Sequence, residues 1–150
     1  MTLPKILPAI LLIMMTAVSC TTLTEKETAA ISADGNFENQ LVSAGNTMLK
    51  AFRENDSRLF SQQLSGELKK EFGTDSFETG RKQITKSAGN MQNCRLLGIL
   101  KGPVFTSALW AVKFEKSGAD KKITGQELLF KLTAARLDDK LKIVSFGFMP

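Results

Sequence analysis

The sequence has no histidine and no tyrosine among its 150 residues, and it has only two cysteines. Histidine is the most common general base and metal ligand, and tyrosine is the phenolic proton donor. Their absence excludes a Ser-His-Asp triad, a Cys-His pair and a zinc site that contains histidine. The chain also lacks a glycine-rich loop of the phosphate-binding or dinucleotide-binding type. We therefore expect no metal ion and no cofactor.

Lysine and arginine together outnumber aspartate and glutamate by 20 to 15, so the formal net charge is +5. The basic residues are spread along the chain and form no single long block, and the pairs at 69–70, 81–82, 121–122 and 140–142 each lie near an acidic residue. This distribution is typical of a solvated surface rather than a nucleic-acid interface. We expect no nucleic-acid partner, while attraction to acidic lipid headgroups or to an acidic protein stays open.

The first residues have the pattern of an export signal. Lys5 supplies positive charge, residues 6–18 form a mostly apolar run interrupted by Pro8, and small residues precede Cys20. The apolar run is shorter than the about 20 residues that a helix needs to cross a bilayer. The pattern predicts a signal peptide over residues 1–19.

Residues 17–20, Ala-Val-Ser-Cys, resemble the lipobox of bacterial lipoproteins, with Ala17 where leucine is usual. In that family the cysteine takes a diacylglycerol, the leader is cut before it, and the new amino group is usually acylated. The resemblance implies a lipid anchor at Cys20, because each buried methylene contributes about 0.8 kcal/mol of membrane binding. Two threonines and no aspartate follow the cysteine, which by the same resemblance implies the outer membrane if the cell has one.

A second interpretation of the leader stays open. The small residues before Cys20 also satisfy the rule for ordinary signal cleavage, which would release a soluble secreted domain. Cys20 could then form a disulfide with Cys94 in an oxidising compartment. If Cys20 is acylated, Cys94 is a free thiol, and its apolar strand context predicts a small, buried and unreactive side chain.

Residues 20–35 are mostly polar and rich in small residues, which predicts a flexible tether between the anchor and a single folded domain over residues 36–150. The first half of that domain has helical periodicity. We predict one helix from Asn36, its N-cap, to about residue 53, a second helical region over 56–72 that can break at residues 65–66, and a third over 74–88.

The second half of the domain alternates apolar and polar residues, as strands do. Strands are predicted over residues 91–100, 104–116, 126–136 and 141–149, with turns at 101–103, 117–120 and 138–139. The last strand is expected to direct Val144, Phe146 and Phe148 to one face. The expected fold class is α+β, with three N-terminal helices packed on a curved four-stranded antiparallel sheet.

This order of elements resembles the cystatin-like cone of the nuclear transport factor 2-like superfamily, in which bacterial lipoproteins of unknown function are common. Residues 51–60, Ala-Phe-Arg-Glu-Asn-Asp-Ser-Arg-Leu-Phe, and the hairpin over residues 132–146 carry the resemblance. It implies helices that close over one face of a bent sheet. A likeness of fold does not transmit a function.

In that family the cone can be a ligand pocket, an active site or simply core. Large side chains at these spacings are usually packing. The ligand-binding candidates are Trp110, Met48, Phe52, Phe130 and Phe146. Trp110 stands out, because a buried indole N–H needs a partner and a large amphipathic ring at a cone mouth could grip a ligand.

Enzymes of this superfamily that move protons place a carboxylate base and a tyrosine or acid donor inside the cone. Tyrosine is absent, and Glu115 and Glu127 flank one turn where surface charges are expected. We predict no catalytic residue. The favoured function is a non-catalytic accessory module of the cell envelope that binds a protein partner or a small apolar ligand. The alternative is a cone-fold enzyme that acts on a small exported metabolite.

The other face of the sheet is expected to be half apolar, which is typical of a partner surface. Related cone folds often pair through this face, so the resemblance implies a possible homodimer. The candidates on this face are Leu109, Lys113, Leu129, Lys131, Thr133 and Ile143.

Overall fold

The computed structural model describes residues 25–118 and 123–150, and it describes side chains from residue 35 onward. The predicted leader, Cys20 and part of the turn at 117–120 lie outside the described residues. No described helix is both long enough and apolar enough to span a bilayer.

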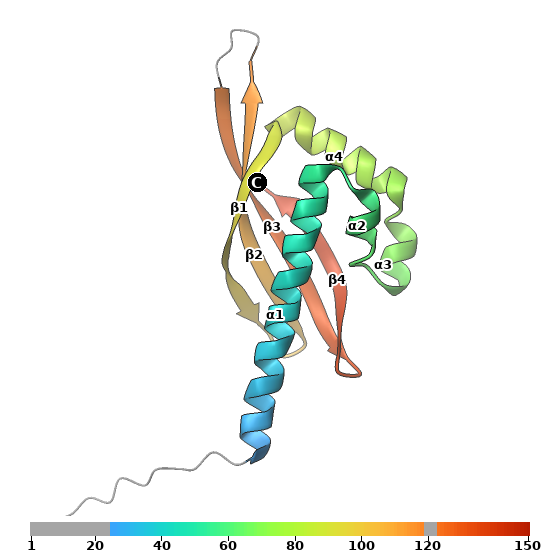
Figure 1. The fold of residues 1–150 in the computed structure, drawn as a ribbon, viewed down its shortest axis with the longest axis vertical. Helices are drawn as coiled ribbons and strands as arrows, with labels where there is room; N and C mark the ends of the chain where they lie inside the picture. The colour runs from blue at the N-terminus through green and yellow to red at the C-terminus, as the bar shows by residue number, and fades with distance from the viewer. Residues whose placement is uncertain (1–24, 119–122) are drawn as a thin grey trace, which may run out of the picture.

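The described chain folds as helices followed by an antiparallel meander (Figure 1). The helices are α1 (Glu25–Glu54), α2 (Ser57–Ser61), α3 (Gly66–Glu71) and α4 (Thr74–Ala88). The strands are β1 (Asn90–Lys101), β2 (Phe105–Ser117), β3 (Ile123–Leu137) and β4 (Lys140–Met149), paired in the order β1-β2-β3-β4. The α+β class and the four-stranded antiparallel sheet are confirmed.

The prediction of three helices is wrong, because four helices precede the sheet in the described residues. The expected break at residues 65–66 separates α2 from α3. Gly66 has a left-handed backbone conformation with φ of 59°, which glycine adopts without a steric penalty. Asp56 caps α2 by accepting a hydrogen bond from the Leu59 backbone N–H at 2.8 Å.

Helix α1 begins at Glu25, so Asn36 is not its N-cap, and residues 25–35 are helical rather than a flexible tether. The sequence of this segment begins Glu-Lys-Glu-Thr-Ala-Ala, which combines good helix formers with acidic residues near a helix N-terminus. Extending an existing helix costs far less than nucleating a new one, so the packed part of α1 can carry this extension without large apolar side chains.

Helices α1 and α4 end within one residue of the predicted positions, at Glu54 and Ala88. Asn55, directly after α1, has φ of 60°, and Gly89, directly after α4, has φ of 94°. These left-handed conformations end a helix. A Cβ on Gly89 would overlap the backbone of Glu115, so glycine is needed there for space as well as for conformation.

Helix α1 runs along one face of the sheet, and α2, α3 and α4 lie beside its C-terminal half (Figure 1). The inner face of β2 presents the predicted alternation, with Ala108, Trp110, Val112 and Phe114 buried. These side chains pack with buried residues of α1 and β3 into a continuous core.

A β-bulge in β4 changes which residues face the core. Ala134 pairs with Ile143, while its neighbour Thr133 pairs with Ser145, so Val144 is the extra residue. Ile143 is therefore buried at 2% exposure, and Val144 faces solvent at 37%. The prediction that placed Ile143 on the partner face and Val144 on the inner face is wrong, because one inserted residue reverses the alternation.

Candidate functional site

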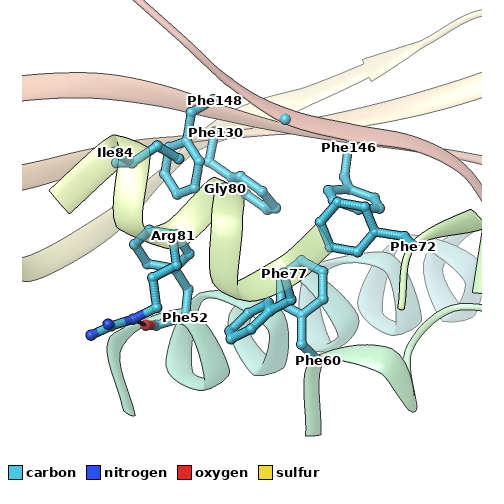
Figure 2. Close-up of a pocket in the computed structure, with 11 residues that line it drawn as sticks. Phe52, Phe60, Phe72, Phe77, Gly80, Arg81, Ile84, Phe130, Phe146 and Phe148 are labelled. Carbon is cyan, nitrogen blue, oxygen red and sulfur yellow. Dashed lines mark hydrogen bonds between the residues drawn. The ribbon is translucent and has the colours of Figure 1, made fainter. Parts of the chain in front are cut away.

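A pocket of about 200 Å³ opens between the helices and the inner face of the sheet (Figure 2). Its walls come from the C-terminal end of α1, from α2, from Phe72 directly after α3, from α4, and from β3 and β4. The lining residues are Phe52, Phe60, Phe72, Phe77, Gly80, Arg81, Ile84, Phe130, Phe146, Gly147 and Phe148.

Phenylalanine rings in contact with one another form most of the wall. The Phe72 and Phe146 rings meet edge to face with centroids 4.8 Å apart, and the Phe60 ring lies 5.2 Å from Phe146. On the other side, the Phe130 and Phe148 centroids are 5.1 Å apart. Such tilted and edge-to-face contacts hold rings in fixed positions and leave a wholly hydrocarbon surface.

Gly80 creates the space in the middle of the pocket. Phe77, Gly80 and Ile84 recur on one side of α4 at helical spacing, and all three line the pocket. No heavy atom lies within 4 Å of the position that a Cβ on Gly80 would take. The side of α4 that lines the pocket therefore carries no side chain at Gly80, and the space there is open.

Arg81 is the one charged residue of the lining. Its Nε donates a hydrogen bond to the Phe52 carbonyl oxygen at 2.8 Å. Its guanidinium carbon also lies 5.9 Å from the centroid of the Phe52 ring, a cation–π contact. The side chain thus lies at the edge of the pocket, and Figure 2 shows its guanidinium at the C-terminal end of α1, directed away from the phenylalanine rings.

The pocket suits a small apolar group and offers no acid–base pair. Its lining contains no carboxylate, and arginine stays protonated in proteins. An engineered apolar cavity of about 150 Å³ stays dry and binds benzene. A space of about 200 Å³ can therefore hold one ring with a small substituent.

The five ligand-binding candidates divide between two places. Phe52, Phe130 and Phe146 line the pocket, whereas Met48 and Trp110 are fully buried in the packed core. Trp110 is not at a cone mouth. Its indole Nε1 donates to the Asn46 Oδ1 at 3.0 Å, and its ring lies so close to Gly45 that a Cβ there would overlap it.

Sequence reasoning did not identify Gly80, Arg81, Phe60, Phe72 or Phe77 as residues of the pocket. A signal was present: ten phenylalanines occur with no tyrosine, and several recur on the inward sides of the predicted helices. Periodicity identifies the inward side of a helix, but it does not show whether that side meets another side chain or a gap.

No family model matches the chain, and no curated protein matches it significantly. Among solved structures it is similar to a "putative dehydratase from the NTF2-like family" of Streptomyces avermitilis, with a TM-score of 0.53 and 12% identity over 77% of this chain and 97% of the other. The domain has the nuclear transport factor 2-like fold. A SEC-C motif containing protein from Rhodopseudomonas palustris aligns with a TM-score of 0.45 and 10% identity, over 66% of this chain and 70% of that one.

The outer face of this nuclear transport factor 2-like sheet holds the remaining partner candidates. Leu109, Leu129 and Lys131 are half-buried. Lys113 is exposed and pairs with Glu115 at 2.9 Å. Thr133 is buried, and its hydroxyl shares a hydrogen bond of 2.8 Å with Ser107.

The two glutamates considered for catalysis lie on the outer face, away from the pocket. Glu115 pairs with Lys113, and Glu127 pairs with Arg95 at 3.5 Å. Within the described ranges, no group of three His, Cys, Asp or Glu side chains could hold a metal ion. Both glutamates belong to exposed ion pairs, which contribute little stability.

Cys94 is exposed, so the prediction of a buried side chain is wrong. It lies on β1, an edge strand that pairs with one neighbouring strand only. An apolar sequence at such an edge does not ensure that a side chain is buried. Partial burial of the thiol raises the pKa of Cys94, and the positive charge of Arg53 opposes that increase.

Proposed function

We propose that the protein is a lipid-anchored protein of the cell envelope whose domain binds a small apolar ligand without chemical turnover. The observation that supports binding is the phenylalanine-lined pocket, held open by Gly80. A catalytic role is less well supported, because the lining supplies no carboxylate to act as a base. The similarity to the Streptomyces protein concerns the fold and adds nothing on activity.

Gly80 offers a matched test of binding. We would reconstitute the full-length chain in phosphatidylcholine nanodiscs and measure binding of a neutral single-ring probe, 4-fluorobenzyl alcohol, by ¹⁹F NMR, with empty nanodiscs as the blank. Gly80→Leu fills the pocket and should weaken binding about tenfold or more. Gly80→Ala adds one methyl group to the same helix position and should retain most of the binding. Equal binding by wild type and Gly80→Leu would contradict the proposal.

The anchor is proposed from the lipobox resemblance at Cys20. Helix α1 begins at Glu25, and its Glu25–Asn36 segment is about 17 Å long at 1.5 Å per residue. The domain would then stand on a short helical stem rather than on a flexible tether. Mass spectrometry of the mature N-terminus should show acyl chains on Cys20, and Cys20→Ala should leave the envelope membrane fraction. An unmodified Cys20 joined to Cys94 would support the secreted alternative instead.

We also propose that two copies pair through the outer face of the sheet. Support comes from three large apolar side chains toward one end of that face, Leu100, Phe105 and Leu137, which are each about half exposed. Light scattering of the full-length protein in nanodiscs loaded at increasing protein-to-disc ratios tests this. Phe105→Glu should abolish a dimer, whereas Lys116→Glu, an exposed change near the other end of β2, should not. A monomer at every protein-to-disc ratio would contradict the proposed dimer.

A further inference from the structure

The charge at the edge of the pocket indicates which apolar ligands fit best. Arg81 is half-buried beside a hydrocarbon wall, yet it forms no ion pair with any carboxylate in the described part of the chain. By contrast, Arg53 and Arg95 pair with Glu54 and Glu127. A cation that is partly removed from water and lacks a counter-ion gains more from an anionic ligand than a fully hydrated one does.

The position of the guanidinium is already set before any ligand arrives. Its Nε donates a hydrogen bond to the Phe52 carbonyl oxygen at 2.8 Å, in the last turn of α1, and its guanidinium carbon lies 5.9 Å from the centroid of the Phe52 ring. The negative end of a helix dipole favours a cation at this place. Since Nε makes the bond to the protein, the two terminal nitrogens keep their N–H groups for another acceptor. Fixing a side chain in advance lowers the entropy that binding must overcome.

We propose that the ligand is a small apolar carboxylic acid, with its ring or short branched chain among the phenylalanines and its carboxylate on Arg81. This inference rests on the proposed binding function and names the ligand class for the same pocket. The planar guanidinium presents two parallel N–H groups, a geometry that matches the two oxygens of a carboxylate. The pocket volume limits the apolar part to about one ring.

Gly80 and Arg81 therefore divide the recognition between them. Gly80 sets the size of the apolar part, because any side chain there would enter the open space. Arg81, the next residue of α4, sets the charge of the other end. Adjacent residues of a helix point about 100° apart, so one can face the pocket centre while the other reaches its edge.

The test compares acids with their neutral amides in the full-length chain in phosphatidylcholine nanodiscs. The probes are 4-fluorobenzoate, 4-fluorophenylacetate and 3-(4-fluorophenyl)propionate, which vary the spacing between ring and carboxylate, and the three matching amides. At least one acid should bind about tenfold tighter than its amide, because a charge-assisted bidentate contact replaces a neutral one. Arg81→Gln should remove that preference, so that the acid and its amide bind this variant with about equal affinity.

Lys82→Gln is the matched control, since it removes the same charge from an exposed side chain one residue away. It should keep the preference for the acid. If Arg81→Gln loses amide binding as well, Arg81→Lys takes its place and should lower the preference while the amide still binds. If amides bind but no acid is preferred, or if the preference survives in the Arg81 variants, this inference is overturned and the binding function stands. If neither acids nor amides bind, both fall.

Discussion

Two glycines on the inward sides of helices lead to opposite outcomes in this domain. Gly45 of α1 lies against Trp110, whose ring fills the place that a side chain would take. Gly80 of α4 faces open space, and the pocket forms around it. The two sites have the same residue, the same secondary structure and the same sheet beneath them. The difference shows that a missing side chain makes a pocket only where no neighbour is large enough to fill the gap.

The two glycines differ because the side chain facing Gly45 is large and is hydrogen-bonded to the helix. Trp110 is the largest side chain of the chain, and its bond to Asn46 holds the indole against α1. The rings that line the pocket with Gly80 are all phenylalanines, and those of Phe130 and Phe148 on the sheet pack against each other. Close packing is restored at one glycine and left incomplete at the other.

The largest effect is expected at Gly45. Gly45→Ala would force the new methyl group into the Trp110 ring, and we expect it to destabilise the fold by about 2 kcal/mol or more despite the better helix propensity of alanine. Urea unfolding followed by tryptophan fluorescence measures this loss. Trp110→Phe should recover part of it in the double variant. If Gly45→Ala leaves the urea midpoint of unfolding unchanged, the Trp110 ring does not fill the space at Gly45.

A smaller loss is expected at Asn46. Asn46→Ala would leave the buried indole N–H of Trp110 without its acceptor, and we expect a cost of about 1–2 kcal/mol in the free energy of unfolding. Ser43→Ala changes an exposed polar residue one turn earlier and is the control. In a Trp110→Phe background the Asn46 substitution should cost nearly nothing. If it costs the same there, the hydrogen bond is not the cause.

At Gly80 we expect an alanine to have the opposite effect on the stability of the fold. Gly80→Ala places a methyl group in open space, so we expect it to stabilise the domain by about 0.5–1 kcal/mol through helix propensity alone. Thermal unfolding beside Gly45→Ala gives the sharpest form of the comparison. Destabilisation by both alanines would mean that the space at Gly80 is not open in solution.

The smallest effect is expected at Cys94 on β1, away from both glycines, and it concerns the reactivity of the thiol rather than the stability of the fold. Because burial raises the pKa of Cys94, a smaller fraction of its thiol is ionised at a given pH than in a free thiol. Iodoacetamide should therefore react with folded Cys94 more slowly than with the urea-unfolded chain at about pH 8. Arg53→Gln should slow the folded reaction further. A faster folded reaction would place the thiol in a different environment.

Local chemistry made much of the fold predictable. The alternation along β2 identified its buried face, and the helix ends at Asn55 and Gly89 follow from residue types that tolerate left-handed backbone. The Asp138-Asp139 hairpin joins β3 to β4, as expected, with φ values of 49° and 57°. Three of the five ligand-binding candidates also line the pocket.

The errors share one origin, which is that they depend on contacts between distant segments. The bulge at Val144 cannot be seen in β4 alone, because it is a property of the pairing with β3. The early start of α1 depends on a helix that is already held by packing further along. Cys94 is exposed because β1 lies at the edge of the sheet.

The sequence by itself determined the order of elements, the inward side of most of them and the absence of histidine and tyrosine chemistry, because these follow from residue type and spacing. It also holds the lipobox pattern at Cys20, which stays a prediction. Only the tertiary structure decided that Trp110 closes the gap at Gly45 while Gly80 leaves a pocket beside Arg81. That outcome depends on which side chains meet across the interface between helix and sheet, and no local pattern encodes it.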